Sequence, residues 1–200
     1  NQNVDWVTAP VDYNGEVIYR IKPSKTAIFK LYSSYNTNKL AVKYPNIENL
    51  NDKILFKQDN ENIYLNSSYK EALGKMWTVF AGMSYANDVD ETNIDTFRIR
   101  SDESLVQGRL TFTYHINNGN NIKFGSEFQS LNINGLYNKY IGNIDERFQA
   151  YYAENNWFIT PKLAARTGLR FEHSEVIDKK NIAPRFSMAY KTGKHPQVSA

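Results

Sequence analysis

Clusters of turn-forming residues divide this chain into segments of about ten residues, in which apolar and polar side chains alternate. Gly, Pro, Asn and Asp supply the positive or fixed φ angles that tight turns need. We expect tight turns at 23–25, 72–75, 117–121, 160–161 and 192–196. Longer polar connections are expected at about 36–62, 87–102, 134–143 and 175–181. Short and long connections alternate, and this order is typical of a membrane-spanning β-meander with hairpins at one end and loops at the other.

The composition agrees with strands at a membrane boundary. The chain has 200 residues with 41% hydrophobic residues, and its 14 Tyr, 11 Phe and 3 Trp favour strands and the water–lipid interface. The mean hydropathy of −0.60 is low for a close-packed sandwich. No apolar stretch approaches the roughly 18 residues of a membrane helix, so a bilayer would have to be crossed by strands. The absence of Cys excludes disulfides, and a net charge of +3 is too small to indicate a nucleic-acid partner.

The alternation is clearest over 105–116, and strands are also expected at 122–129, 162–172 and 182–191. We predict about nine strands and the beginning of a tenth at the carboxy-terminal end, and the segment around Trp6 could add one more. The fold class is therefore all-β, an antiparallel transmembrane β-barrel meander of about 9–10 strands that forms an open portion of a larger barrel. Residues 1–200 are treated as one partial barrel domain.

One face of the predicted sheet carries long cationic side chains on nearly every strand. If this face lines a lumen, it needs counter-charge from an interior plug, an anionic solute or water. The acids expected on it are few, for example Glu127 and Glu172. The basic residues assigned to this face are Arg20, Lys22, Lys30, Lys70, Arg109, Lys123, Arg147, Arg166, Arg170, Arg185 and Lys191.

Two alternative architectures have sequence patterns of the same kind. A soluble β-sandwich that acts as a binding module also alternates apolar and polar residues, but several strands here exceed the five or six residues usual in globular sheets. The aromatic residues Trp77, Trp157 and Phe158 also lie beside predicted hairpins, where an interfacial girdle belongs. A complete small outer-membrane barrel, acting as an adhesin or an enzyme, is the second alternative.

Motifs for catalysis or metal binding are weak. The histidines have no ligand-like spacing, and we expect pore-lining or turn roles for His115, His173 and His195. Acidic residues are expected in one solvated loop, and they lack the Gly and Glu of an EF-hand: Asp88, Asp90, Glu91 and Asp95. Loop side chains that could contact a sugar or peptide are Tyr137, Asn138, Tyr140 and Asn143. We assign no catalytic, cofactor-binding or metal-binding residue.

Four motifs in the carboxy-terminal third carry a family resemblance. In order they lie at 148–157 (FQAYYAENNW), 159–163 (ITPKL), 168–172 (GLRFE) and 181–187 (NIAPRFS). This order and spacing resemble the barrel of TonB-dependent outer-membrane receptors. In that family a strand ending in an aromatic–acidic–Trp pattern turns through a Thr-containing hairpin into a GLRxE strand and returns through a PR strand.

The resemblance implies a segment of a non-enzymatic importer that takes up a large scarce nutrient, such as a metal chelate, a glycan or a peptide. It implies the outer membrane of a Gram-negative bacterium and about 22 strands around a plug. The implied partners are outer-membrane lipid, the plug domain, the remaining strands and the TonB complex. A surface lipoprotein is left open, and no cofactor or nucleic acid is expected. A TonB box, a plug domain and a terminal strand ending in an aromatic residue are not found in these 200 residues.

Overall fold

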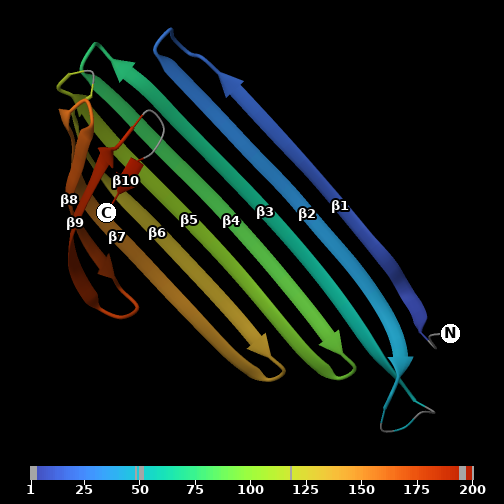
Figure 1. Ribbon diagram of the computed structural model, residues 1–200. Coiled ribbons are helices and arrows are strands. Elements are labelled where there is room, and N and C mark those ends of the chain that lie inside the picture. The colour runs from blue at the N-terminus through green and yellow to red at the C-terminus, as the bar shows by residue number, and fades with distance from the viewer. Residues whose placement is uncertain (1–3, 48, 50–51, 118, 194–196, 200) are drawn as a thin grey trace.

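A computed structural model describes residues 4–47, 49, 52–117, 119–193 and 197–199, and these residues form one ten-stranded antiparallel sheet (Figure 1). Nine strands are long and the tenth has three residues. The strands are β1 (Asp5–Ile21), β2 (Ala27–Pro45), β3 (Lys53–Leu73), β4 (Trp77–Ile94), β5 (Phe97–His115), β6 (Asn121–Tyr137), β7 (Tyr140–Thr160), β8 (Leu163–Ser174), β9 (Lys179–Lys191) and β10 (Gln197–Ser199).

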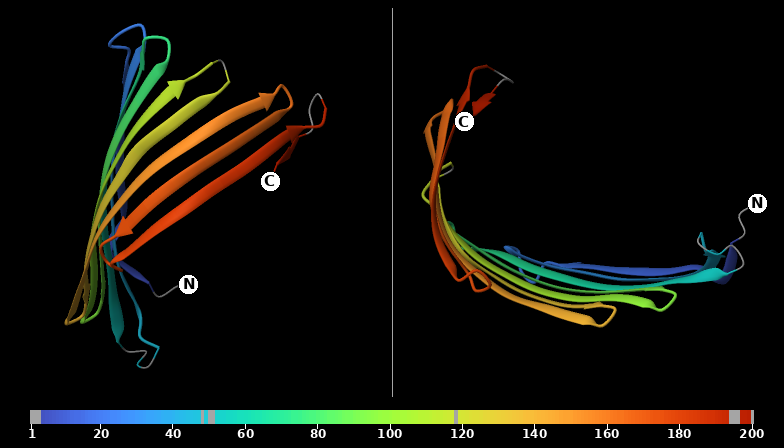
Figure 2. Two further views of the ribbon diagram at one scale, coloured as in Figure 1. Left: turned by 90° about the vertical axis from the view of Figure 1, so that its left-hand side faces the viewer. Right: turned by 90° about the horizontal axis from the view of Figure 1, so that it is seen from below.

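Each strand pairs with its neighbours in the sequence, so the sheet order runs from β1 to β10 without a crossover. Two views show that the sheet curves strongly and stays open, with β1 and β10 at its two edges (Figure 2). No part of the described chain forms a helix that could cross a membrane. The predicted meander and its open form are therefore confirmed.

The strand register assigns each side chain to one of two faces, because directly opposed residues of antiparallel strands share a face. The row Arg109, Glu127, Ala150 and Glu172 belongs to what we call the polar face. The opposite, apolar face carries the row Val79, Phe112, Phe124, Ala153 and Leu169. Large apolar side chains are exposed on this second face, as expected for a surface that meets lipid: Met83, Leu110, Phe128, Tyr151, Ile182 and Phe186.

The face assignment from sequence is wrong at Arg147. Arg147 lies opposite Ser130 and two residues from Gln149, which lies opposite Phe128, so it shares the apolar face. It lies toward the loop end of β7, beyond the run of apolar side chains, and its guanidinium is 3.9 Å from the carboxylate of Glu175. The other strand residues assigned to a lumen face lie on the polar face of the register.

The four long connections expected from the sequence are also corrected. The polar segments 87–94 and 97–102 are paired strand, and only residues 95–96 connect β4 to β5. Residues 138–139 connect β6 to β7, residues 175–178 connect β8 to β9, and β2 and β3 pair as far as Pro45 and Lys53. The Asn- and Asp-rich segments are therefore paired strands. Hydrogen bonds between side chains on neighbouring strands add to the backbone hydrogen bonds there. Asn132 bonds Asp145 at 2.9 Å, for example.

Tight turns at the loop end depend on residues that tolerate the left-handed conformation. Asp95, Asn138 and Asp178 have φ angles of 55°, 56° and 45°. Asn and Asp adopt this conformation more readily than most side chains, so one such residue closes each of these three connections. At the hairpin end, the predicted turns are confirmed where the structure describes them, and Asn118 and residues 194–196 lie outside the described part. The segment around Trp6 is the first part of β1 and adds no further strand.

Tyr152 forms a side-chain bridge across three strands on the polar face. It lies directly opposite Gly125, and its hydroxyl is 2.6 Å from the Thr111 hydroxyl on β5. The ring can cross β6 because Gly125 has no side chain: a Cβ atom there would lie 2.7 Å from the Tyr152 hydroxyl and would also clash with the Leu110 carbonyl. Tyr152 and Thr111 are both buried. Such pairing of glycine with an aromatic ring is a known device for fixing register in curved sheets.

Gly125→Ala should therefore displace the Tyr152 ring and destabilise the sheet by about 1–3 kcal/mol. The measurement is the free energy of unfolding in urea, for the full-length protein in phospholipid vesicles. Gly108→Ala is the matched control, because a Cβ at Gly108 has no neighbour within 4 Å. It should change stability by less than about 0.5 kcal/mol. Equal effects of the two substitutions would contradict the bridge.

Candidate functional site

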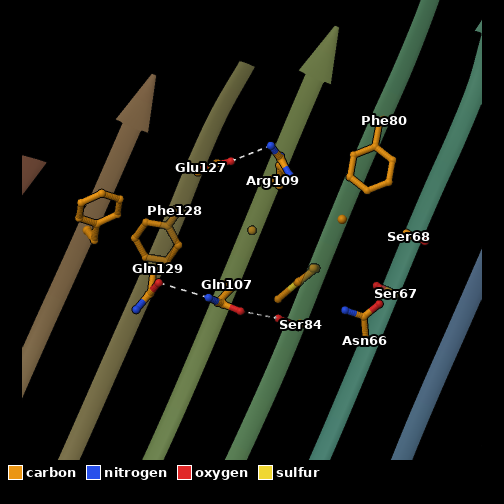
Figure 3. Close-up of a pocket in the computed structure, with 14 residues that line it drawn as sticks. Asn66, Ser67, Ser68, Phe80, Ser84, Gln107, Arg109, Glu127, Phe128 and Gln129 are labelled. Atoms are coloured by element: carbon orange, nitrogen blue, oxygen red, sulfur yellow. Dashed lines mark hydrogen bonds and ion pairs between the residues drawn. The ribbon is translucent and has the colours of Figure 1, made fainter. Parts of the chain in front are cut away.

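Two adjoining hollows on the polar face are the candidate site, and Phe80 and Arg109 line both of them. The first has a volume of about 420 Å³ and is lined by amide, hydroxyl and aromatic side chains, so we call it the amide hollow (Figure 3). The second has a volume of about 500 Å³ and is the basic hollow. Its side chains from β3, β4, β5, β6 and β7 are Lys70, Thr78, Phe80, Arg109, Thr111, Thr113, His115, Asn121, Lys123, Tyr152 and Asn156.

Hydrogen bonds between neighbouring strands hold the amide hollow in one arrangement. The Ser84 hydroxyl donates to the Gln107 side-chain oxygen at 3.3 Å, and the Gln107 amide donates to Gln129 at 3.2 Å (Figure 3). These residues form one cross-strand row with Asn66 and Phe148. Amide groups beside an aromatic ring can hydrogen-bond and stack on a polar solute, and this row extends over five strands.

A chain of ion pairs lies beside the hollows. Arg109 and Arg170 both contact the Glu127 carboxylate, at 3.0 and 2.8 Å, and Arg170 also contacts Glu172 at 2.5 Å. The network crosses β7 at Ala150, whose methyl group is small enough for Arg170 to reach over it toward β6. The Arg109 guanidinium also lies 5.8 Å from the centre of the Tyr152 ring. The polar face is thus built from mutually oriented side chains.

Glu127→Gln should remove one partner from both arginines of this network. Arg170 is only 13% exposed, whereas Arg109 is 55% exposed. Losing the ion pair with Glu127 should therefore cost more stability at Arg170 than at Arg109. We expect a decrease of about 1–3 kcal/mol in unfolding free energy, measured by urea titration of the full-length protein in vesicles. Glu154→Gln is the control, because Glu154 forms no ion pair among the described residues. A similar loss in both variants would indicate a general charge effect.

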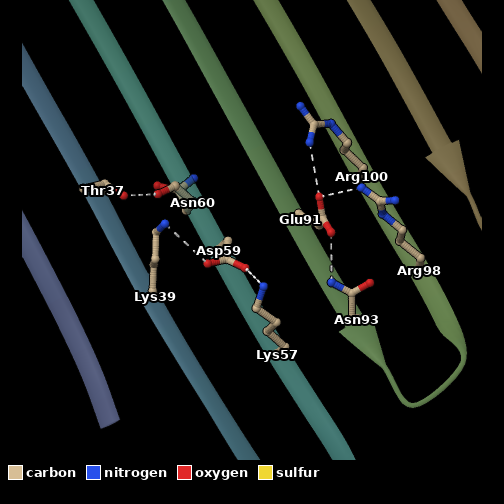
Figure 4. Close-up of polar contacts among 9 residues, drawn as sticks. All are labelled: Thr37, Lys39, Lys57, Asp59, Asn60, Glu91, Asn93, Arg98 and Arg100. Carbon is tan, nitrogen blue, oxygen red and sulfur yellow. Dashed lines mark hydrogen bonds and ion pairs between the residues drawn. The ribbon is translucent and has the colours of Figure 1, made fainter. Parts of the chain in front are cut away.

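A second network lies on the opposite side of the sheet, at the loop end of the strands (Figure 4). The Glu91 carboxylate accepts bonds from Arg98 at 2.8 Å, Arg100 at 3.2 Å and Asn93 at 3.1 Å. In the same region Asp59 lies 2.7 Å from Lys57. Hydrogen bonds from Asn93 and Arg98, the main causes, lower the pKa of Glu91 to about 2. These contacts explain why a charged segment forms a paired strand.

The lowered pKa predicts how this loop-end network responds to acid. A depressed carboxylate pKa contributes stability that is fully present above the unfolded value, near 4.5, and is lost as pH falls through about 2. Glu91 should therefore stay ionised at pH 4. The check is the carboxyl ¹³C resonance of Glu91 in labelled full-length protein, identified by its absence in Glu91→Gln. A titration midpoint near 4.5 would show that the arginines do not hold the carboxylate.

The structure separates the acidic residues that the sequence placed in one loop. Asp88 and Asp90 lie on the polar face of β4, and the Asn60 amide donates to them at 3.1 and 2.6 Å. Glu91 points to the other face and Asp95 lies in the turn. No group of three or more His, Asp or Glu residues within the described chain could hold a metal ion. The single-loop interpretation is therefore wrong, because an eight-residue polar segment is strand.

The histidines and the loop aromatics also have definite positions. A ring nitrogen of His115 lies 3.1 Å from the Thr78 hydroxyl, and His115 lines the basic hollow. His173 lies 3.9 Å from Asp178, and His195 is outside the described residues. Tyr137 packs edge-on against Phe97 at 4.7 Å, beside the turn that contains Asn138. Ligand contact by Tyr137, Asn138, Tyr140 and Asn143 stays a prediction.

Sequence reasoning did not identify Tyr152, Thr111 or the glutamine pair as parts of one site. Each lies at an even spacing along its strand, so its face was predictable. The register between strands was required to place Gln107 beside Gln129. The Tyr152 bridge had one sequence signal, a glycine within the strand at Gly125.

Comparisons with known proteins agree with this geometry. A family model described as TonB dependent receptor-like, beta-barrel matches residues 6–199. Among solved structures, the chain is similar to the outer membrane transporter YddB from Escherichia coli, with a TM-score of 0.70 at 11% identity over 92% of this chain and 30% of that one. No curated protein matches the chain.

Two further solved structures have the same fold. The copper transporter OprC gives a TM-score of 0.66 at 11% identity, over 95% of this chain and 36% of that chain. The ferric yersiniabactin uptake receptor FyuA from Yersinia pestis gives a TM-score of 0.62 at 12% identity, over 99% and 40% of the two chains. The chain therefore spans between 30% and 40% of the length of these three structures. At such low identity these similarities show the fold alone.

Proposed function

The chain belongs to the TonB-dependent receptor-like β-barrel family of the Gram-negative outer membrane, and on this premise we propose that it forms part of the wall of an energised importer. The observation that carries the proposal is the two-faced curved sheet. Its apolar face exposes large side chains to lipid, and its polar face presents hollows lined by oriented amides and charges. A wall of this kind separates lipid from a hydrated interior.

The proposed assembly contains more than this segment. In the described part of the chain β1 and β10 are the edge strands of the sheet, and the backbone groups of such edges need further strands in a bilayer. We propose that the remaining strands close the barrel, that a plug domain occupies its interior and that the TonB complex supplies energy through a region outside this sequence. A lipoprotein partner at the surface has no support from any contact described above.

The proposed cargo is a large scarce nutrient, either a metal chelate, a glycan or a peptide. Copper and ferric yersiniabactin belong to the names of two similar structures and identify no cargo for this chain. The matching family is one of receptors and transporters, so the proposed role is passage and wall formation without chemistry. This proposal makes the amide hollow a surface that lies along the path of a solute.

The proposal is tested by the intact mass of the protein extracted in detergent from outer membranes. We expect a mass several times the 23.1 kDa of this sequence, with an interior domain preceding the barrel. Proteolytic peptides that cover the additional mass would give its sequence. A heat-modifiable monomer with a mass near 23.1 kDa would contradict the proposal and indicate a complete small barrel. Purification without detergent would indicate a soluble sandwich.

A further inference from the structure

A further hollow lies on the apolar face, over β5, β6 and β7, which are neighbours in the sheet (Figure 1). Its volume is about 420 Å³. It stays open at Gly108, where a Cβ atom would have no neighbour within 4 Å. Arg109 and Glu127 border it, although their side chains belong to the polar face. The apolar-face residues that line this apolar-face hollow are Gly108, Leu110, Ser126, Phe128, Gln149 and Tyr151.

A polar cluster adjoins this hollow on its loop-end side. Gln149 lines the hollow and lies directly opposite His173, which lies opposite Lys180. Arg147 has the next position on the same face of β7. We call these four residues the outward cluster. The next row toward the hairpin end is aromatic and aliphatic, with Tyr151, Phe171 and Ile182. The cluster therefore begins where the lipid-facing row ends, at the level of lipid headgroups.

The outward cluster has hydrogen-bond donors that the described residues do not use. The Arg147 side chain is 65% exposed, and its guanidinium lies 3.9 Å from the Glu175 carboxylate, beyond hydrogen-bond distance. Lys180 and Gln149 have no side-chain partner within the part of the chain that the structure describes. A guanidinium, an ammonium and an amide are thus available to an external acceptor.

The acids near the cluster do not occupy these donors. Glu175 and Asp178 belong to the turn after β8, and each makes only a 3.9 Å contact with the cluster. Asp145, the next acid along this face of β7, accepts a bond from Asn132 at 2.9 Å. Among the described residues no carboxylate forms an ion pair with Lys180. Exposed ion pairs contribute little stability, so a better acceptor can replace those of the turn.

We propose that the outward cluster and the apolar-face hollow together bind one phosphorylated lipid. The lipid phosphate accepts bonds from Arg147 and Lys180, and one acyl chain lies in the hollow. This inference rests on the proposed function, because the apolar face must lie in a bilayer. The lipid belongs to the leaflet at the loop end of the strands, which corresponds to the extracellular side of outer-membrane barrels.

The spacing of the two cations suits one phosphate group. Arg147 and Lys180 are two strands and two residues apart, so about 12 Å separates their Cα atoms along the sheet. Their long side chains can meet over the gap, where His173 and Gln149 offer further polar atoms. A guanidinium binds phosphate through parallel hydrogen bonds, and basic residues beside a lipid-facing surface recognise lipid headgroups.

The hollow favours a lipid over a free anion as the occupant. Gln149 belongs to both the cluster and the hollow, so the two surfaces are continuous. Leu110, Phe128 and Tyr151 are exposed in the hollow. A concave surface gives an acyl chain more van der Waals contacts than a flat one, even inside a bilayer. A free phosphate would contact the cluster alone.

The test is the affinity of the full-length protein for lipid A, a diphosphorylated glycolipid, measured by native mass spectrometry in a neutral detergent. Arg147→Gln with Lys180→Gln should weaken binding about tenfold, because two charge-assisted bonds to phosphate are lost. Lipid A without its phosphates should bind the wild type equally weakly. Heat-modifiability on a gel reports an intact barrel. If the double variant does not assemble, Lys180→Gln replaces it, with an expected loss of about threefold.

Gly108→Leu tests the hollow without a change in charge. The new side chain occupies the space of the acyl chain, and we expect binding of lipid A to weaken about threefold. The matched control is Lys39→Gln with Lys43→Gln, which removes two cations from the same face and end of the sheet, on β2. Asp59 keeps its 2.7 Å contact with Lys57 in this control. Its affinity for lipid A should equal that of the wild type.

Three results would overturn the lipid site. They are equal affinities in the cluster variant and the control, unchanged affinity in Gly108→Leu, and displacement of lipid A by an equal concentration of inorganic phosphate, which would indicate a site for free anions. Extraction separates these results from a failure of the proposed function. A large barrel that needs detergent but shows equal affinities refutes only the lipid site, whereas a protein that purifies without detergent refutes both.

Discussion

The hydrogen-bond ladder between neighbouring strands is the interaction on which the rest of this structure depends. In lipid an unpaired backbone group has no water to bond, so each strand must find a partner along the full width of the bilayer. Strands β2 to β7 have 17 to 21 residues, whereas about 9–11 suffice to cross a membrane. The pairing therefore continues well beyond the lipid, where side-chain bonds such as those of Glu91 and Asn60 support it.

Once the hydrogen-bond ladder fixes the register, the two faces of the sheet require different side chains. Where the apolar face meets lipid its side chains need only be large and lipophilic, and Phe186 and Met83 are exposed there. Side chains on the polar face must satisfy each other, so Arg109, Glu127 and Arg170 form contacts across several strands. Tyr152 does the same on the polar face, because its ring covers Gly125 while its hydroxyl bonds the Thr111 hydroxyl.

Period-two alternation was enough to predict the fold class, the hairpins and nearly every face. It failed at Arg147, because the polar segment of β7 above the lipid no longer alternates in hydrophobicity although it still alternates in space. The same failure made residues 87–102 look like a loop. Asn, Asp and Glu have low strand propensity, and the bonds that overcome it join residues far apart in the sequence, as Asn60 joins Asp88. The candidate site shares this limit, since its hollows need the register of five strands.

The short connections at the loop end have a mechanical consequence. Only two residues join β4 to β5, so the two strands stay paired up to their ends. The paired part extends about nine residues, or about 30 Å, beyond Tyr85. These paired strands have already lost their conformational entropy on folding. They therefore lose little more when a molecule contacts them. This end of the sheet therefore presents a preformed surface of fixed shape to any molecule that contacts it.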